Sequence, residues 1–323
     1  MLKGLAFTPP VAGRISIGRV VERNGKRLPE KDDQFTITTQ IQHRQDWLLH
    51  PLNQSLRGEN PDEKLRRIPI RLLFNDPSLN FRAEYSLFDR TSGRPLCVGD
   101  GENCKRVTKD GMQTLPCQGP DICTLAQHQG CKPYGRLTVQ IDDGENTDHF
   151  IFRTTGFNSI RTLFARLHYF SALSNNQLAC LPLELRLRGK STRMSHGTAI
   201  FYADITLRSD MSMKETLKAA RDLNEQRIAA GFNQEALDAA ARLGFQNGIF
   251  EEDAEDMASV LEEFYPATVI ATSSNNATPE TAEQLIQTTS TLAEKLEQKV
   301  RNQNGHTNPV IHQSQPVTNG TQP

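Results

Sequence analysis

Apolar and polar residues alternate along several short stretches in the first part of the chain, as in strands that bury one face. The alternation is clear at residues 34–42 (QFTITTQIQ), 68–76 (IPIRLLFND) and 81–89 (FRAEYSLFD). A turn at RTSGRP then predicts a returning strand at LCVGDG. Four more strands are expected further on, at residues 135–141, 149–155, 178–189 and 197–208. Residues 1–33 are polar and rich in turn formers, so the first predicted strand follows them.

One helix interrupts the strands, in the stretch FNSIRTLFARLHYFSAL. Asn158 or Ser159 is the expected N-cap. The apolar residues recur at helical spacing and are predicted to face the core: Ile160, Leu163, Phe164, Leu167 and Phe170.

The pattern becomes helical after Met211. One helix is predicted to stop at Gly231 and a second to begin at Asn233. A third, EEDAEDMASVLEEFYP, has acidic residues in its first turn, which favours a helix N-terminus. Residues 266–279 are small and polar like a linker, residues 280–302 fit another helix, and the polar residues 303–323 are expected to be disordered.

These elements predict an α+β protein. A β-rich domain over residues 1–210 would hold a cysteine-rich metal-binding loop and one packed helix. An α-helical C-terminal extension would follow, with an acidic helical segment at residues 211–265 before the linker, the last helix and the tail.

Charge is unevenly distributed within a net charge of −1. Residues 1–210 carry 29 Lys and Arg against 22 Asp and Glu, giving +7, whereas residues 211–265 carry 5 against 12, giving −7. A basic front part fits a protein that binds polyanions, and acidic helices fit an arm that contacts protein because they repel phosphate. A soluble protein with uneven surface charge is the alternative.

Five of the six cysteines lie within residues 97–131. The N-terminus is not a signal peptide and no apolar run is long enough for a membrane span, so we expect a cytoplasmic protein with reduced thiols. A loop with so few apolar residues cannot bury a core and is not expected to fold by itself. A zinc ion bound by four thiolates would supply the missing folding free energy. Cys104, Cys117, Cys123 and Cys131 are the predicted ligands.

Other interpretations of the cysteines stay open. Cys97 lies in a strand-like stretch and is the substitute ligand, and His128 is a further candidate. Free thiols in a disordered loop are the main alternative to a structural zinc ion. A catalytic zinc ion would need an open position and a general base, for which only Glu102 and Asp121 are near in sequence. Cys180, in LACLPL, is expected to be an inert core residue.

Two basic stretches are candidate nucleic-acid contacts. In KLRRIPIR these are Arg66 and Arg67. In LELRLRGKSTR the leucines are predicted to face inward and the polar side chains outward, so that Arg186, Arg188, Lys190 and Arg193 could contact phosphates. A solvated surface is the alternative meaning of such runs. No sequence motif of a hydrolase, metalloprotease, nucleotide-binding or dinucleotide-binding protein is present.

Several stretches, taken in their order along the chain, resemble those of the recombination directionality factor-like proteins of phages and integrative elements. They are LPEKDDQFTITT, RRIPIRLLFNDPSLNF, the cysteine-rich segment, FRTTGFNSIRTLFARLHYFSAL and LPLELRLRGK. The resemblance spans about residues 1–210 and implies that residues 97–131 match the segment at which this family is expected to bind metal.

The resemblance also implies a function. Members of the family bind a large serine integrase on its DNA sites, switch it from integration to excision, and do not cut DNA themselves. The expected partners are therefore a recombinase or another recombination protein, and DNA within that complex. A metal-dependent hydrolase or nuclease accessory in a single-strand annealing module is the alternative function.

Overall fold

The computed structural model describes residues 10–23, 26–43, 46–58, 60, 62–142, 148–191, 193, 199–247, 260–261 and 264–265. The chain divides into two compact units, Met1–Val269 and Ile270–Pro323, and every described residue belongs to the first. The linker, the last helix and the disordered tail that the sequence predicts lie outside the described residues. So does most of the predicted acidic helix. The division at residue 210 stays a prediction.

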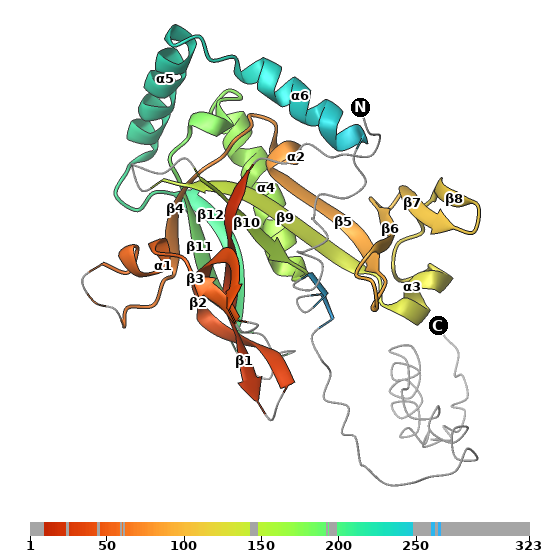
Figure 1. Ribbon diagram of the computed structural model, residues 1–323. Helices are drawn as coiled ribbons and strands as arrows, with labels where there is room; N and C mark the ends of the chain where they lie inside the picture. Colours follow the sequence, from red (N-terminus) through yellow and green to blue (C-terminus); the bar gives the residue numbers. More distant parts are fainter. Residues whose placement is uncertain are drawn as a thin grey trace, which may run out of the picture. The chain divides into compact units, whose positions relative to one another are not determined.

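One large mixed sheet dominates the structure (Figure 1). Its order is β3-β2-β1-β10-β9-β5-β6-β7-β8, with β4, β11 and β12 joined to it at β9. The strands are β1 (Val11–Arg23), β2 (Lys26–His43), β3 (Asp46–Leu49), β4 (Arg67–Arg71), β5 (Phe81–Phe88), β6 (Pro95–Gly99), β7 (Asn103–Thr108), β8 (Gly111–Pro116), β9 (Lys132–Ile141), β10 (His149–Thr154), β11 (Leu183–Lys190) and β12 (Ile200–Leu207).

Helices cover parts of this sheet and its edges. They are α1 (Leu52–Ser55), α2 (Pro77–Asn80), α3 (Thr124–Gln129), α4 (Phe157–Leu173), α5 (Met213–Ala229) and α6 (Gln234–Asn247), with a 3-10 turn at Leu178–Cys180. None of the described helices has the length and apolar character that crossing a bilayer requires.

The sheet branches at β9. The first half of β9 pairs with β5, and its last residues pair with β4, which continues through β11 to β12. The sheet curves enough for β2 to contact β11 and β12. The main core fills this curve under α4, and it contains Phe35 and Phe152 in an edge-to-face contact. Burying each such ring contributes about 1.5–3 kcal/mol, so this core holds the two branches together.

Most of the predicted strands are confirmed, and one long strand was missed. Residues 34–42 lie in β2, and β5, β6, β9, β10 and β12 occur where strands were predicted. The prediction at residues 178–189 begins too early, because Leu178–Cys180 form a 3-10 turn and β11 starts at Leu183. The prediction at residues 68–76 is too long, because β4 ends at Arg71. Residues 11–23, which seemed polar and turn-rich, form β1. This strand is stabilised by two neighbours, pairing in parallel with β10 and antiparallel with β2.

Helix α4 confirms the predicted helix but corrects two details. Its N-cap is Gly156, with no side-chain cap. Ser159 instead accepts a 3.1 Å hydrogen bond from the backbone N–H of Ala203 and so satisfies an edge group of β12. Phe164 was assigned to the core face, yet 56% of it is exposed. The buried apolar stripe consists of Ile160, Leu163, Leu167 and Phe170, which is narrower than the spacing indicated, and α4 packs mainly on β12.

Helices α5 and α6 pack back against the body. The stop at Gly231, with φ of +81°, and the cap at Asn233, whose Oδ1 accepts from Ala236 N at 2.9 Å, confirm the predicted ends. Ala241 of α6 is buried against Phe74 and Leu79. Helix α6 is thus a docked element of the first unit rather than a separate arm.

Candidate functional site

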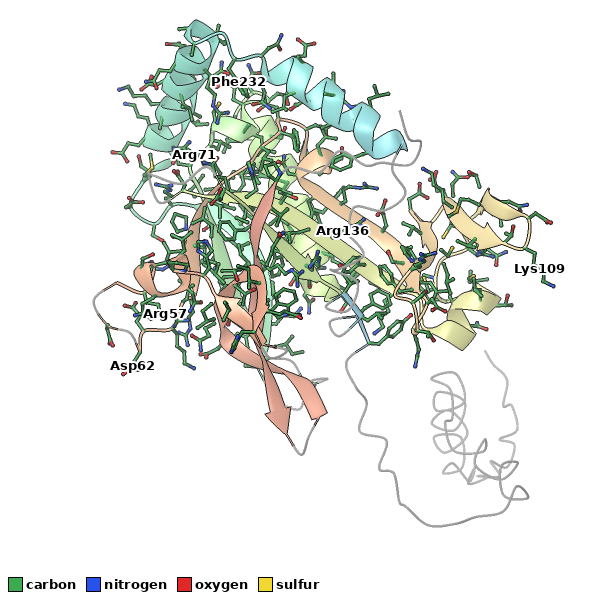
Figure 2. All side chains as sticks on the ribbon, viewed as in Figure 1. Arg57, Asp62, Arg71, Lys109, Arg136 and Phe232 are labelled. Atoms are coloured by element: carbon green, nitrogen blue, oxygen red, sulfur yellow. The ribbon has the colours of Figure 1, made fainter. Side chains whose placement is uncertain are left out.

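The cysteine-rich segment forms a folded module (residues 97–131) rather than an irregular loop. Strands β7 and β8 make a hairpin whose tip carries Lys109 (Figure 2). At the turn, Thr108 Oγ1 donates to Gly111 O at 2.8 Å. Earlier, the Asp100 carboxylate accepts from the N–H groups of Glu102 and Asn103, both at 2.7 Å. Local backbone bonding therefore orders a segment that has few apolar residues.

All five cysteines of the module meet at one end of the sheet. Cys97 lies on β6, Cys104 on β7, Cys117 directly after β8, Cys123 at the N-cap of α3 and Cys131 directly before β9. All are free thiols, as is Cys180, which is buried in the main core as predicted. The sequence predicted a metal site from four of them, with Cys97 as the substitute ligand, and the structure brings all five into one cluster.

Gly99 makes the close approach of these strands possible. A Cβ atom at this position would lie 2.7 Å from the Cβ of Cys104 and 3.0 Å from the Sγ of Cys117. Such distances are shorter than van der Waals contact, so any larger residue would push the strands apart. The glycine thus brings β7 and the end of β8 against β6.

Four of the thiols line a cavity of about 20 Å³, which is the room that one water molecule or ion needs. They are Cys97, Cys117, Cys123 and Cys131. Arg106 lines the same cavity. The substitute ligand Cys97 therefore lines it, whereas Cys104 lies beside it, 2% exposed and clustered with Leu87 and Cys97.

Burial and neighbouring thiols oppose deprotonation of Cys104 and Cys131. Burial, and to a smaller extent the charge of neighbouring Cys97, raises the pKa of Cys104 to about 11. The same two causes raise the pKa of Cys131 to about 12. Cys123 behaves differently, since backbone N–H groups at the start of α3, Ala126 first, lower its pKa. Arg106 Nη2 also donates to Cys123 Sγ at 3.6 Å. Four thiolates would thus need more positive charge than Arg106 brings, and a divalent cation supplies such charge.

The geometry itself does not make a metal centre. Among the residues described above, no three or more His, Cys, Asp or Glu side chains have the arrangement of a metal site. The side chain of His128 lies outside the described residues. The thiols fit zinc in type and number. The zinc ion and its ligands therefore stay a prediction.

Four of the six predicted nucleic-acid contacts share one face of the sheet and form the basic strip (Arg67, Arg186, Arg188 and Lys190). Arg67 on β4 lies directly across from Arg186 on β11. Lys190 donates to Asn158 Oδ1 of α4 at 2.7 Å. Arg66 is apart from this strip, because it forms an ion pair with Asp33 of β2. Arg193 is exposed beyond the end of β11.

Buried carboxylates offset much of this positive charge. The Oδ2 atom of Asp204 accepts from Arg188 at 3.0 Å, and its Oδ1 accepts from Arg166 of α4 at 3.0 Å. Glu184 was predicted to face solvent but is 8% exposed and accepts from Ser209. The leucines of β11 face inward as predicted. The strip thus has a small net positive charge rather than a strongly basic surface.

A row of arginines crosses the sheet, and the sequence did not indicate it. Arg82 on β5 pairs across with Arg136 on β9, which pairs across with Arg153 on β10. Glu84 forms ion pairs with both Arg82 and Arg136. Burial acts to raise the pKa of Glu84, but the charges of Arg136 and Arg82 outweigh it and hold that pKa below its usual range. Register between distant strands creates this row, so only a strand pairing could have predicted it.

A family model described as Gp3-like, recombination directionality factor-like, matches residues 12–208. No curated protein and no solved structure matches the chain.

The matched region corresponds closely to the sheet. It begins at the second residue of β1 and ends one residue after β12, so it contains the cysteine module, the arginine row and the basic strip. It leaves α5 and α6 outside. The match covers more than half of the 323 residues. This chain therefore belongs to the recombination directionality factor-like family.

Proposed function

We propose that the protein is a non-enzymatic accessory factor of DNA recombination, which binds a recombinase on its DNA and controls the direction of the reaction. The family match carries this proposal, because it spans all twelve described strands of the sheet. In the described residues no arrangement of side chains favours the alternative, a metal-dependent hydrolase or nuclease accessory.

The basic strip supports contact with DNA inside the complex rather than tight binding by the protein alone. Arg188 is held by buried Asp204, and Lys190 by Asn158. Protein–phosphate attraction depends on how many cations are available to neutralise phosphates. With few available cations, the strip can orient DNA that a recombinase already holds.

A structural zinc ion in the cysteine module belongs to the same proposal. The cavity lined by Cys97, Cys117, Cys123 and Cys131 supports it, and so does the absence of a disulfide between any of these thiols. A bound zinc ion would supply folding free energy to a module with little apolar core. Three ligands of this ion are Cys117, Cys123 and Cys131. The fourth is either Cys104, as the sequence predicted, or Cys97, which lines the cavity.

Metal analysis of purified variants tests the zinc proposal. Cys117→Ser and Cys123→Ser should each lower the zinc content of the protein, whereas Cys180→Ser should keep it, because Cys180 lies in the main core. Comparing Cys97→Ser with Cys104→Ser identifies the remaining ligand. Full zinc occupancy in both Cys117→Ser and Cys123→Ser, or no zinc in the wild-type protein, would contradict the proposal.

DNA binding with and without the partner tests the proposed function. The protein alone should bind attachment-site DNA weakly, and it should form a clear additional complex when the element's own recombinase is already bound. Arg186→Ala should weaken that complex with a reduced salt dependence. Tight, partner-free and salt-sensitive DNA binding would contradict a role that depends on a recombinase.

A further inference from the structure

Four residues beyond the family-matched region pack against one end of the sheet. They are the described part of the predicted acidic helix EEDAEDMASVLEEFYP: Val260, Leu261, Phe264 and Tyr265. The N–H of Tyr265 donates to Leu261 O at 2.8 Å, as in a helical turn. Val260 and Phe264 are completely buried. We call these four residues the distal turn.

Phe264 of the distal turn fills a pocket made by β5 and β9. Its ring packs edge-to-face on Phe88, the last residue of β5, with centroids 4.9 Å apart. It packs in the same way on Tyr134, near the start of β9, at 5.8 Å. Phe88 and Tyr134 also contact each other edge-to-face. These buried rings form a cluster separate from the main core, and such contacts add to the stabilisation from apolar burial.

Hydrogen bonds and cations hold the distal turn in this pocket. Lys132 Nζ donates to Phe264 O and lies 5.0 Å from the centre of the Phe264 ring. The guanidinium of Arg90 lies 4.6 Å from the centre of the Tyr265 ring. Tyr265 Oη donates to Phe88 O at 3.0 Å. Cations attract the faces of aromatic rings, so both rings gain polar as well as apolar contacts. The aromatic pocket consists of Phe88, Arg90, Lys132 and Tyr134.

The distal turn contacts the junction between α3 and β9, which carries a thiol of the cysteine module. Gly130 ends α3, and a Cβ atom there would lie 3.7 Å from Tyr265 Cε1, so this ring packs against the junction. Cys131 comes next and lines the thiol cavity. Lys132 follows and donates to Phe264 O. Both chain neighbours of Cys131 are therefore in contact with the distal turn.

The thiols and the distal turn lie on opposite faces of the same strands. Neighbouring residues of a strand direct their side chains to opposite faces. Leu87 of β5 packs with Cys97 and Cys104. The next residue, Phe88, packs with Phe264. Contacts on one face can thus fix the strand ends from which thiols project on the other.

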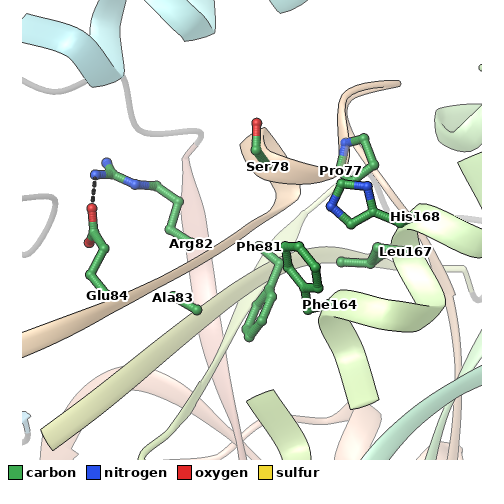
Figure 3. Close-up of a pocket in the computed structure, with 9 residues that line it drawn as sticks. All are labelled: Pro77, Ser78, Phe81, Arg82, Ala83, Glu84, Phe164, Leu167 and His168. Atoms are coloured by element: carbon green, nitrogen blue, oxygen red, sulfur yellow. Dashed lines mark hydrogen bonds and ion pairs between the residues drawn. The ribbon is translucent and has the colours of Figure 1, made fainter. Parts of the chain in front are cut away.

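Strand β5 also lines a groove of about 260 Å³ beside α4 (Figure 3). The charged lining of this groove is the ion pair of Arg82 with Glu84. Phe164 on its wall is 56% exposed, whereas Phe264 is completely buried in the aromatic pocket. The chain itself therefore identifies the occupant of the aromatic pocket, and Phe164 offers a matched phenylalanine that is not docked.

We propose that the aromatic pocket is a peptide-binding site whose ligand is the distal turn of the same chain, and that this binding holds the α3–β9 junction with Cys131 in place. The whole pocket lies within the family-matched residues 12–208, whereas the turn lies outside them. The ligand class is a short helical segment with apolar residues at its first, second, fifth and sixth positions, as in residues 260–265. The inference requires neither a role in recombination nor a bound metal ion.

Hydrogen exchange of full-length variants at equal metal content tests whether the turn holds the junction. Phe264→Ala should make exchange in residues 124–132 about tenfold faster or more, because it empties the pocket and lets the junction open locally. Tyr265→Phe removes only the hydroxyl group bonded to Phe88 and should cause a smaller increase. Phe164→Ala is the matched control and should leave this exchange unchanged. Equal exchange in wild type and Phe264→Ala would overturn the inference.

A synthetic peptide distinguishes a bound ligand from a fixed part of the core. The peptide of residues 256–268 is added to full-length Phe264→Ala at about 1 mM, the range of effective concentration that a short tether gives. It should restore slow exchange of residues 124–132, and the same peptide with Phe264→Ala should not. The main core should keep the thermal transition of wild type. A peptide that restores nothing, or a variant whose main core also unfolds, would make the turn an integral part of the fold and overturn the inference.

Discussion

Asp204 of β12 holds Arg188 of the neighbouring strand β11 through a 3.0 Å hydrogen bond from the arginine Nε to the carboxylate Oδ2. The Asp204 side chain is 3% exposed and Arg188 is 41% exposed, so a buried anion anchors a half-exposed cation at the edge of the basic strip. Its other oxygen holds Arg166 of α4. This one carboxylate therefore links the last strand of the sheet to the helix that covers it.

Replacing Asp204 with Asn should destabilise the fold and strengthen DNA binding at the same time. The loss of two charge-assisted hydrogen bonds to a buried anion should cost about 2–4 kcal/mol. The two released arginines should raise the affinity for DNA and steepen its salt dependence. Unfolding in denaturant and DNA titration at two salt concentrations measure the two effects. Asp222→Asn, at an exposed pair on α5, is the control and should change neither. An Asp204→Asn variant as stable as wild type would contradict the anchoring role.

Glu84 should make stability fall in acid. Its folded pKa lies below the ordinary value, so the stability it contributes is present above the unfolded pKa and is lost as the pH falls through the folded pKa. Glu84→Gln removes this dependence. The free energy of unfolding of the variant should therefore decline less than that of wild type when the pH is lowered below 4.5, the ordinary value for this group. Parallel curves for the two proteins would show that Arg82 and Arg136 do not depend on this carboxylate.

Asp238 should have the opposite pH dependence to Glu84: it should weaken the docking of α6 as the pH rises. Its Oδ2 accepts from Asn75 N at 3.1 Å and its Oδ1 from Gln234 Nε2 at 2.8 Å. Burial raises the pKa of Asp238 above 3.8. Because the pKa of Asp238 is raised in the folded state, its contribution to stability is fully present below the unfolded pKa. This contribution is lost as the pH rises through the folded pKa. Hydrogen exchange of α6 should therefore become faster as the pH rises through this range, after correction for the intrinsic rate.

The matched variant for this prediction is Asp238→Asn. In this variant the protection of α6 against hydrogen exchange should not depend on pH across the same range, because the Asn side chain does not ionise. Arg242→Gln removes the nearby exposed pair with Asp76 and should leave the pH dependence of α6 in place. If wild type and Asp238→Asn showed the same pH dependence, Asp238 would not govern the docking of α6.

Substituting Gly99 with Ala should disrupt the cysteine module locally. The new methyl group would meet Cys104 Cβ and Cys117 Sγ at distances below van der Waals contact. Overpacking of this kind costs about 1–3 kcal/mol, and here it would separate the thiols. Limited proteolysis should cut residues 97–131 faster in the variant, and the zinc content that we propose for wild type should fall, while the main core keeps its thermal transition. Unchanged proteolysis and zinc content would mean that β6 and β7 need no close approach.

A helix or strand could be predicted from the sequence when it has one continuous apolar face. Strand β11 and helix α4 show this, because each buries a stripe of apolar residues against the main core. Strand β1 was missed because its stability comes from pairing with β2 and β10, not from its own composition. Phe164 was misassigned for a related reason, since helical spacing gives a stripe but not the width of the surface that covers it.

The candidate site was predictable only in part. A metal site with four cysteine ligands was predicted because five cysteines lie within one short segment. The participation of Cys97 in the cavity lining depended on how tightly β6 and β7 approach at Gly99, which spacing does not reveal. The pairings of Arg188 with Asp204 and of Arg82 with Arg136 depend on strand register over long sequence distances.

The excision reaction is the most direct test of the proposed function. The element's own recombinase is incubated with its two hybrid attachment sites, with and without this protein, and the excised product is quantified. We expect that excision occurs only when the protein is added, and that integration between the unrecombined sites decreases under the same conditions. Equal excision with and without the protein would contradict a role in controlling the direction of recombination.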